Sequence, residues 1–127
     1  MSEYRLSARE ILEGYGELLQ KSRALSEESD ACRQRLERDG TNAGLWLGKA
    51  RRLQAEALRL QRLARRRQLQ AEGLLARLPD AEGRAVLSLR YISLMRYEEI
   101  GEVLGYSPRH IYRLHLRAVQ RLQQGIR

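Results

Sequence analysis

Residues 97–122, which read YEEIGEVLGYSPRHIYRLHLRAVQRL, decide the fold of this chain. Two short helical patterns flank a turn at Gly105, where glycine can supply the positive φ that such a turn needs. Ser107 followed by Pro108 predicts the start of the second helix, because serine caps a helix and proline suits its first position. The pattern predicts a helix-turn-helix in which Gly101 lets the two helices cross closely. Its expected core consists of Ile100, Leu104, Tyr106, Ile111 and Leu114.

A third helix should precede this pair. Residues 81–92 read AEGRAVLSLRYI and are expected to pack through Val86, Leu89 and Tyr91. The first helix of the motif should then span residues 97–104, and the second residues 108–123. Together these three helices predict a C-terminal domain at residues 79–127.

The outward side of the last helix is the candidate functional surface. With Ile111, Leu114 and Ala118 facing inward, the opposite side must face solvent. Residues 107–127 contain five arginines and no acidic residue, which suits the phosphates of DNA. We expect a double-stranded DNA partner, with Arg117 and Arg121 placed for phosphates. The candidate DNA-binding residues are Ser107, Pro108, Arg109, His110, Tyr112, Arg113, Leu116, Arg117 and Arg121.

The sequence pattern of the N-terminal part, residues 1–78, predicts a long antiparallel helical hairpin. Ser7 and Glu10 have the spacing of a capping box at the start of its first helix. Apolar and small residues then recur at steps of three and four, a pattern typical of a coiled coil. Residues 39–42 (DGTN) should end the first helix, and Pro79 the second, after Leu78. The fold class is therefore all-α.

Pairing residues whose numbers sum to 82 gives an expected register for the hairpin. It places Ser22 opposite Leu60, and Tyr15 opposite Arg67 in a cation–π stack. Several leucines lie outside this contact between the two helices, which we call the seam, and must be covered by the C-terminal domain or by a second copy. We expect a homodimer that forms through residues 1–78. The leucines off the seam are Leu12, Leu19, Leu45, Leu58, Leu63, Leu69 and Leu75.

Composition narrows the function classes. The formal net charge is +8 and the pI is about 10.4, which favours a polyanionic partner. Cys32 is the single cysteine, so neither an internal disulfide nor a cysteine-based metal site is expected. His110 and His115 are five residues apart, off the helical step that two zinc ligands need, and His115 suits the edge of the core. We expect no catalytic residue, metal or cofactor, no enzymatic activity and no membrane span, in a cytoplasmic protein.

The stretch LPDAEGRAVLSLRYISLMRYEEIGEVLGYSPRHIYRLHLRAVQRL resembles region 4 of bacterial sigma factors, which recognises the promoter −35 element. Joined to a long helical region, it resembles phage and prophage regulators of the ArpU/RinA type. The resemblance implies DNA contacts at Pro108, Arg109, Tyr112 and Arg113, and an RNA polymerase contact before the motif. The chain departs from the sigma pattern at Pro108 and His115, so known promoter preferences do not transfer.

These observations predict a sequence-specific transcriptional regulator of phage type that reads the major groove with the helix after Ser107. Two alternatives belong to other classes. A small terminase subunit would also join a helix-turn-helix to an oligomerising helical region, but in rings of many subunits. An interaction module would bind RNA polymerase or a sigma factor without binding DNA itself.

Overall fold

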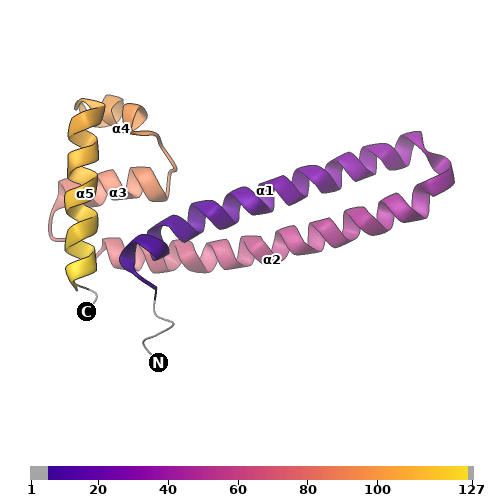
Figure 1. Ribbon diagram of the computed structural model, residues 1–127, viewed down its shortest axis with the longest axis horizontal. Coiled ribbons are helices and arrows are strands. Elements are labelled where there is room, and N and C mark those ends of the chain that lie inside the picture. Colours follow the sequence, from indigo (N-terminus) through magenta and orange to yellow (C-terminus); the bar gives the residue numbers. More distant parts are fainter. Residues whose placement is uncertain (1–5, 126–127) are drawn as a thin grey trace. The chain divides into compact units, whose positions relative to one another are not determined.

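The computed structural model describes residues 6–125, and the regular structure in this range is entirely helical (Figure 1). The predicted all-α fold, with a helical hairpin followed by a helix-turn-helix, is confirmed. Its helices are α1 (Ala8–Arg38), the short 3-10 helix η2 (Gly40–Asn42), α2 (Ala43–Leu75), α3 (Ala81–Tyr91), α4 (Tyr97–Leu104) and α5 (Pro108–Gly125).

Local chemistry sets the ends of the first two helices. The predicted capping box is present, since Ser7 Oγ accepts from Glu10 N at 3.2 Å and Ser7 N donates to Glu10 Oε1 at 3.4 Å. In the loop, Asp39 accepts from Thr41 Oγ1 at 2.6 Å and from Asn42 Nδ2 at 3.0 Å. These bonds lower the pKa of Asp39 to about 2.

The predicted end of the second helix at Leu78 is wrong. Helix α2 ends at Leu75, and the chain tightens into a turn in which Arg77 N donates to Leu74 O and Leu78 N to Leu75 O. Burial of Leu78 explains the apparent continuation of the helical pattern, because this side chain joins the core from the turn.

The chain divides into two compact units. Glu17–Arg65 form one unit, the distal part of the hairpin. The other unit consists of the segments up to Gly16 and from Arg66 onward, so the base of the hairpin belongs with α3, α4 and α5. The division expected after residue 78 stays a prediction.

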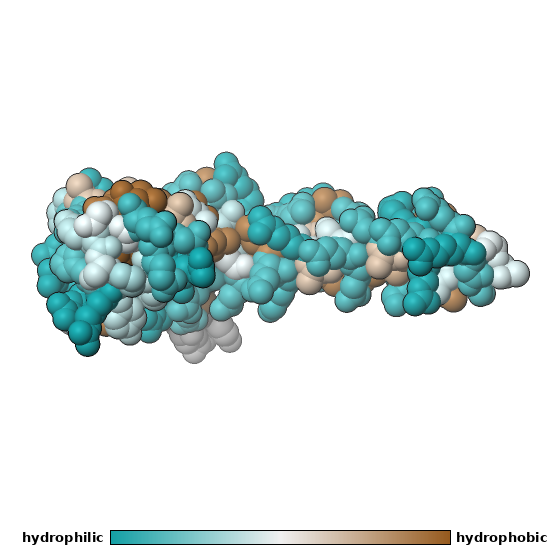
Figure 2. All heavy atoms as spheres, turned by 90° about the horizontal axis from the view of Figure 1, so that it is seen from above, coloured by the Kyte–Doolittle hydropathy of each residue, from teal (hydrophilic) through white to brown (hydrophobic). Residues whose placement is uncertain are grey.

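In the distal unit, small buried residues bring α1 and α2 together. Ser22 Oγ donates to the carbonyl of Ala57 at 3.0 Å, and Ser29 Oγ to the carbonyl of Ala50 at 2.8 Å. Ser22 thus bonds three residues before its predicted partner Leu60, because a buried hydroxyl needs an acceptor and alanine leaves the backbone accessible. The face of the hairpin visible in Figure 2 is mostly hydrophilic, with scattered hydrophobic residues.

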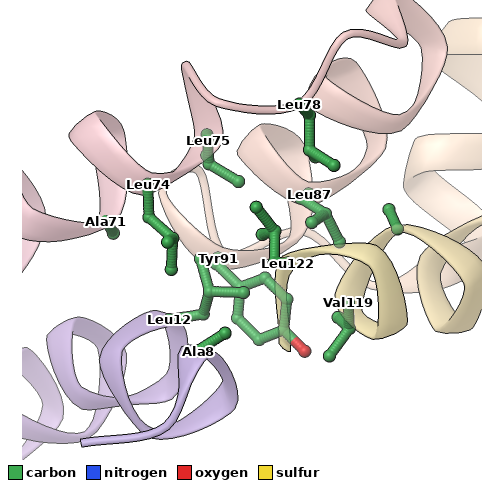
Figure 3. Packing of buried hydrophobic residues seen from close by; sticks show 11 residues of the cluster. Ala8, Leu12, Ala71, Leu74, Leu75, Leu78, Leu87, Tyr91, Val119 and Leu122 are labelled. Atoms are coloured by element: carbon green, nitrogen blue, oxygen red, sulfur yellow. The ribbon is translucent and has the colours of Figure 1, made fainter. Parts of the chain in front are cut away.

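The other unit has a core built from four helices (Figure 3). Leu12 and Leu75, two of the leucines expected to need cover, are buried in it against α3 and α5. The fully buried Leu87 also belongs to it, although the sequence pattern did not single it out. The cluster consists of Ala8, Leu12, Ala71, Leu74, Leu75, Leu78, Leu87, Tyr91, Ala118, Val119 and Leu122.

The expected stack of Arg67 on Tyr15 is not the contact observed in this unit. Arg67 instead lies along Gly14, with its Cδ 3.3 Å from the point where a Cβ of that glycine would stand. Cation–π contacts occur elsewhere in the described range, at Arg35 over Trp46 and at Arg90 over Tyr97. The missing side chain of Gly14 gives the arginine a path along the helix surface.

A second cluster holds the helix-turn-helix together. Val86, Ile100, Ile111 and Leu114 are buried, and Leu89, Met95, Tyr97 and Leu104 pack against them. The expected core position of Tyr106 is wrong, because its side chain is 39% exposed. Its hydroxyl donates to Glu82 Oε2 at 2.5 Å, and its ring meets the edge of the His110 ring.

Candidate nucleic-acid interface

The turn between α4 and α5 fixes the geometry of the site. Gly105 has φ of 79°, a left-handed conformation that glycine adopts without strain. Gly101 O accepts from Gly105 N at 2.8 Å and from Tyr106 N at 2.9 Å. A Cβ on the buried Gly101 would overlap the carbonyl oxygen of Tyr106. The crossing therefore requires glycine at position 101, and it is the backbone of Tyr106, not its ring, that packs there.

The start of α5 is capped as the sequence predicts. Ser107 Oγ accepts from His110 N at 3.2 Å, and Pro108 occupies the first helical position. The free amide groups and the dipole make this helix start electropositive, which favours an approaching anion. Both Ser107 and Pro108 are exposed.

One side of α5 is anchored in the protein. Ile111, Leu114, Ala118, Val119 and Leu122 are buried. The burial of the predicted inward set Ile111, Leu114 and Ala118 is thus confirmed. An 18-residue helix is about 27 Å long, so the anchored side extends well beyond the first turns.

The opposite side of α5 is exposed and carries positive charge without an acidic residue. Arg109, Arg113 and Arg117 follow one another at steps of four and share this outer face. Each step of four residues rotates the side chain by about 40° around the helix axis. Arg121 is therefore turned away from Arg109, and it lies beside Arg77 and Pro79. Of the nine candidate DNA-binding residues, eight are exposed: Ser107, Pro108, Arg109, Tyr112, Arg113, Leu116, Arg117 and Arg121. The ninth, His110, is half-buried against Tyr106.

Tyr112 lies at the border between the outer face and the core. Its side chain is 47% exposed, and its ring makes an edge contact with Tyr97 at a centroid distance of 5.5 Å. This contact fixes the ring against α4 while one side stays open. Tyr112 therefore supports the packing of the two helices and remains available to a ligand.

His115 is a core residue, and the expected structural role is confirmed. It is 2% exposed, and its Nε2 lies 2.5 Å from the hydroxyl of Tyr91. Burial, followed by the positive charges of Arg9 and Arg90, lowers the pKa of His115 to about 4. The imidazole is therefore neutral near pH 7 and adds no charge to the interface.

The structure brings two further arginines next to α5 that sequence reasoning missed. Arg9, from α1, lines a shallow groove with Leu116, Val119, Gln120 and Gln123. Arg77, from the turn after α2, lines a hollow with Arg121 on the other flank. Neither has a local sequence signal, because both approach α5 only through the packing of the hairpin base.

Within residues 6–125, no group of His, Cys, Asp or Glu side chains is arranged to hold a metal ion. None of the helices described there has an apolar stretch long enough to cross a bilayer.

A tight glycine turn, a capped and anchored second helix and an outer face of arginines define a helix-turn-helix domain of the DNA-binding class. Residues 74–124 match the family model of Sigma-70, region 4. This part of the chain is therefore a sigma-70 region 4-like helix-turn-helix unit, and the predicted resemblance to sigma region 4 is confirmed, whereas the resemblance to ArpU/RinA-type regulators stays a prediction. The match covers less than half of the chain. No curated protein and no solved structure matches it.

Proposed function

We propose that this chain is a sequence-specific transcriptional regulator of phage or prophage type, of the ArpU/RinA kind, which inserts α5 into the major groove of DNA. The observation that carries the proposal is the outer face of α5, exposed and free of acidic residues, on a helix whose other side is buried. The major groove is about 12 Å wide and admits one helix. The buried side holds α5 rigidly enough to read bases.

The proposed contacts differ along the helix. Arg109 and Arg113, near the electropositive start of α5, are assigned to base edges, where a guanidinium can bind guanine with two hydrogen bonds. Ser107, Pro108, His110, Tyr112 and Leu116 surround them as supporting contacts. Arg117 and Arg121 lie further along and are assigned to phosphates, which position the protein without reading sequence.

The proposed assembly is a homodimer that forms through the hairpin. Leu45 is 63% exposed, and the half-buried Leu63 follows it by about five helical turns, so both lie on one side of α2. A second copy covering this side would remove both leucines from water. Two-fold symmetry would then call for a palindromic DNA site.

Selection of bound duplexes from random DNA, followed by binding titrations, tests this function. Arg113→Ala should weaken binding to the selected duplex by about 1–3 kcal/mol and leave binding to a scrambled duplex nearly unchanged. The matched control is Arg23→Ala, which removes an exposed arginine from α1. It should preserve the preference for the selected duplex. Equal losses on both duplexes for Arg113→Ala would refute base reading.

Light scattering after gel filtration separates the alternatives by mass. A dimer fits the regulator, whereas a ring of many subunits would identify a small terminase subunit. Capture of RNA polymerase without any DNA binding would identify an interaction module. Capture of polymerase together with DNA binding would add the polymerase contact that the resemblance to sigma region 4 implies.

A further inference from the structure

A small hollow lies between the end of α5 and the turn that follows α2. Arg77, from the turn, and Arg121, from the helix, line it with exposed side chains. The other residues that line it are apolar or glycine, and its three leucines are buried in the core of the unit (Figure 3). They are Leu74, Leu78, Pro79, Leu122 and Gly125. Two positive side chains therefore stand beside an apolar floor.

The charge of these two arginines is not balanced by a direct contact. Within residues 6–125, neither guanidinium forms a hydrogen bond or an ion pair. Helix α5 contains no acidic residue, and the acids nearest to Arg77 in sequence have other contacts. Glu72 accepts a hydrogen bond from Gln68 at 3.4 Å. Asp80 caps α3 through both of its carboxylate oxygens.

A purely structural role for the two arginines has less support. Arginines near the end of a helix often bind its last free carbonyl groups. In the turn after α2, Arg84 makes this contact, since its Nη1 donates to the carbonyl of Leu78 at 2.5 Å. Arg9, on the other flank of α5, is also paired, with its Nε 3.5 Å from Glu13 Oε1. The two arginines of the hollow are thus the flanking charges that an external anion can bind.

The size of the hollow limits its occupant to a small group. Its volume is about 80 Å³, well below the roughly 300 Å³ at which typical ligand pockets begin. A guanidinium suits a phosphate group because it can donate two parallel hydrogen bonds to it. We propose that Arg77 and Arg121 together bind the phosphate backbone of duplex DNA beside the groove that α5 enters. This inference rests on the proposed function for its ligand and adds Arg77, from outside the helix-turn-helix, to the interface.

The position along α5 fits a contact with the backbone. Arg121 follows Arg109 by twelve residues, which is about 18 Å along the helix. The major groove is only about 12 Å wide, so this end of α5 reaches the rim of the groove when the first turns lie inside it. Phosphates form that rim, and contacts with them position a protein without reading sequence. Loss of Arg77 should therefore weaken binding to every duplex alike.

The test uses the full chain with Arg77→Gln, which leaves the backbone bond from Arg77 N to Leu74 O in place. Fluorescence anisotropy measures affinity for the selected and scrambled duplexes between about 50 and 200 mM salt. The slope of log affinity against log salt should fall in magnitude by about one for each bound protomer. The ratio of the two affinities should stay unchanged. Arg77→Lys keeps the positive charge and should restore most of the slope.

The matched control is Arg23→Gln, which removes an exposed arginine from α1 and should keep the wild-type slope. A wild-type slope for Arg77→Gln, or an equal fall for Arg23→Gln, would overturn the inference. A fall that Arg77→Lys does not reverse would overturn it too, because the charge would then not be responsible. Thermal unfolding followed by circular dichroism checks the structural role, which predicts a lower unfolding temperature for Arg77→Gln with an unchanged slope.

The failure of this inference can be distinguished from the failure of the proposed function. Equal losses on both duplexes for Arg113→Ala would refute base reading by α5, while the slope of Arg77→Gln would still decide the backbone contact. A wild-type chain that binds neither duplex would overturn both.

Discussion

Adding one methyl group at Gly101 should destabilise the helix-turn-helix, although alanine is the better helix former. A Cβ on Gly101 would overlap the carbonyl oxygen of Tyr106, which belongs to backbone and cannot rotate away. The turn must open, which strains the bond from Tyr106 N to Gly101 O, 2.9 Å long in the native turn.

The magnitude follows from three contributions. Overpacking a buried site costs about 1–3 kcal/mol, and loss of the turn hydrogen bond costs about 1 kcal/mol. Alanine has a higher helix propensity than glycine, and this gain offsets about 1 kcal/mol of that cost. Gly101→Ala should therefore lower the free energy of unfolding by about 1–3 kcal/mol.

Gly73→Ala is the matched control, because Gly73 lies in α2 within the same unit and nothing approaches its missing Cβ within 4 Å. This substitution should raise the free energy of unfolding by about 0.5–1 kcal/mol. Urea unfolding followed by circular dichroism measures both, and the fluorescence of Trp46 reports the distal unit as an internal reference. A neutral or stabilising Gly101→Ala would refute the tight crossing.

Three further predictions concern a cap, a buried histidine and a phosphate contact. Asp80 caps α3 by accepting hydrogen bonds from Glu82 N at 3.2 Å and Gly83 N at 3.1 Å. Asp80→Ala should therefore lower the free energy of unfolding, measured with urea, by about 0.5–2 kcal/mol. Asp80→Asn, which keeps an acceptor, should stay much closer to wild type. Folding lowers the pKa of His115 from 6.5 to about 4, so the folded state loses stability as pH falls through this window. By about pH 5 that loss is about 2 kcal/mol relative to pH 7, and a His115→Gln variant should show less of it in the same assay. Arg121→Ala should reduce the salt slope of DNA binding by about one unit on selected and scrambled duplexes alike; an unchanged slope would remove Arg121 from the phosphate contacts.

Features set by neighbouring residues could be predicted from the sequence. The capping box at Ser7 and the cap at Ser107 form between residues three apart, so their spacing alone locates two helix starts. Gly105 likewise identifies the turn, since few other residues adopt its φ. The helical period of α5 predicts which of its sides is buried, and the structure confirms that side.

Features that depend on packing between distant segments could not be predicted. Tyr106 has an apolar ring at a core-like spacing, but the turn at Gly105 turns that ring outward to Glu82. Arg9 comes beside α5 only because the hairpin base shares a core with α3 and α5. The end of α2 could not be predicted because Leu78 is buried from a turn, which periodicity does not distinguish from a helix.

Site-specific photo-crosslinking tests the assignment of α5 to the groove most directly. A photoreactive residue in place of Leu116, 40% exposed on the outer side of α5, is compared with one in place of Leu94, 42% exposed in the same unit. With the selected duplex, position 116 should crosslink to bases and position 94 should not. Crosslinking at position 94 with none at position 116 would contradict the account.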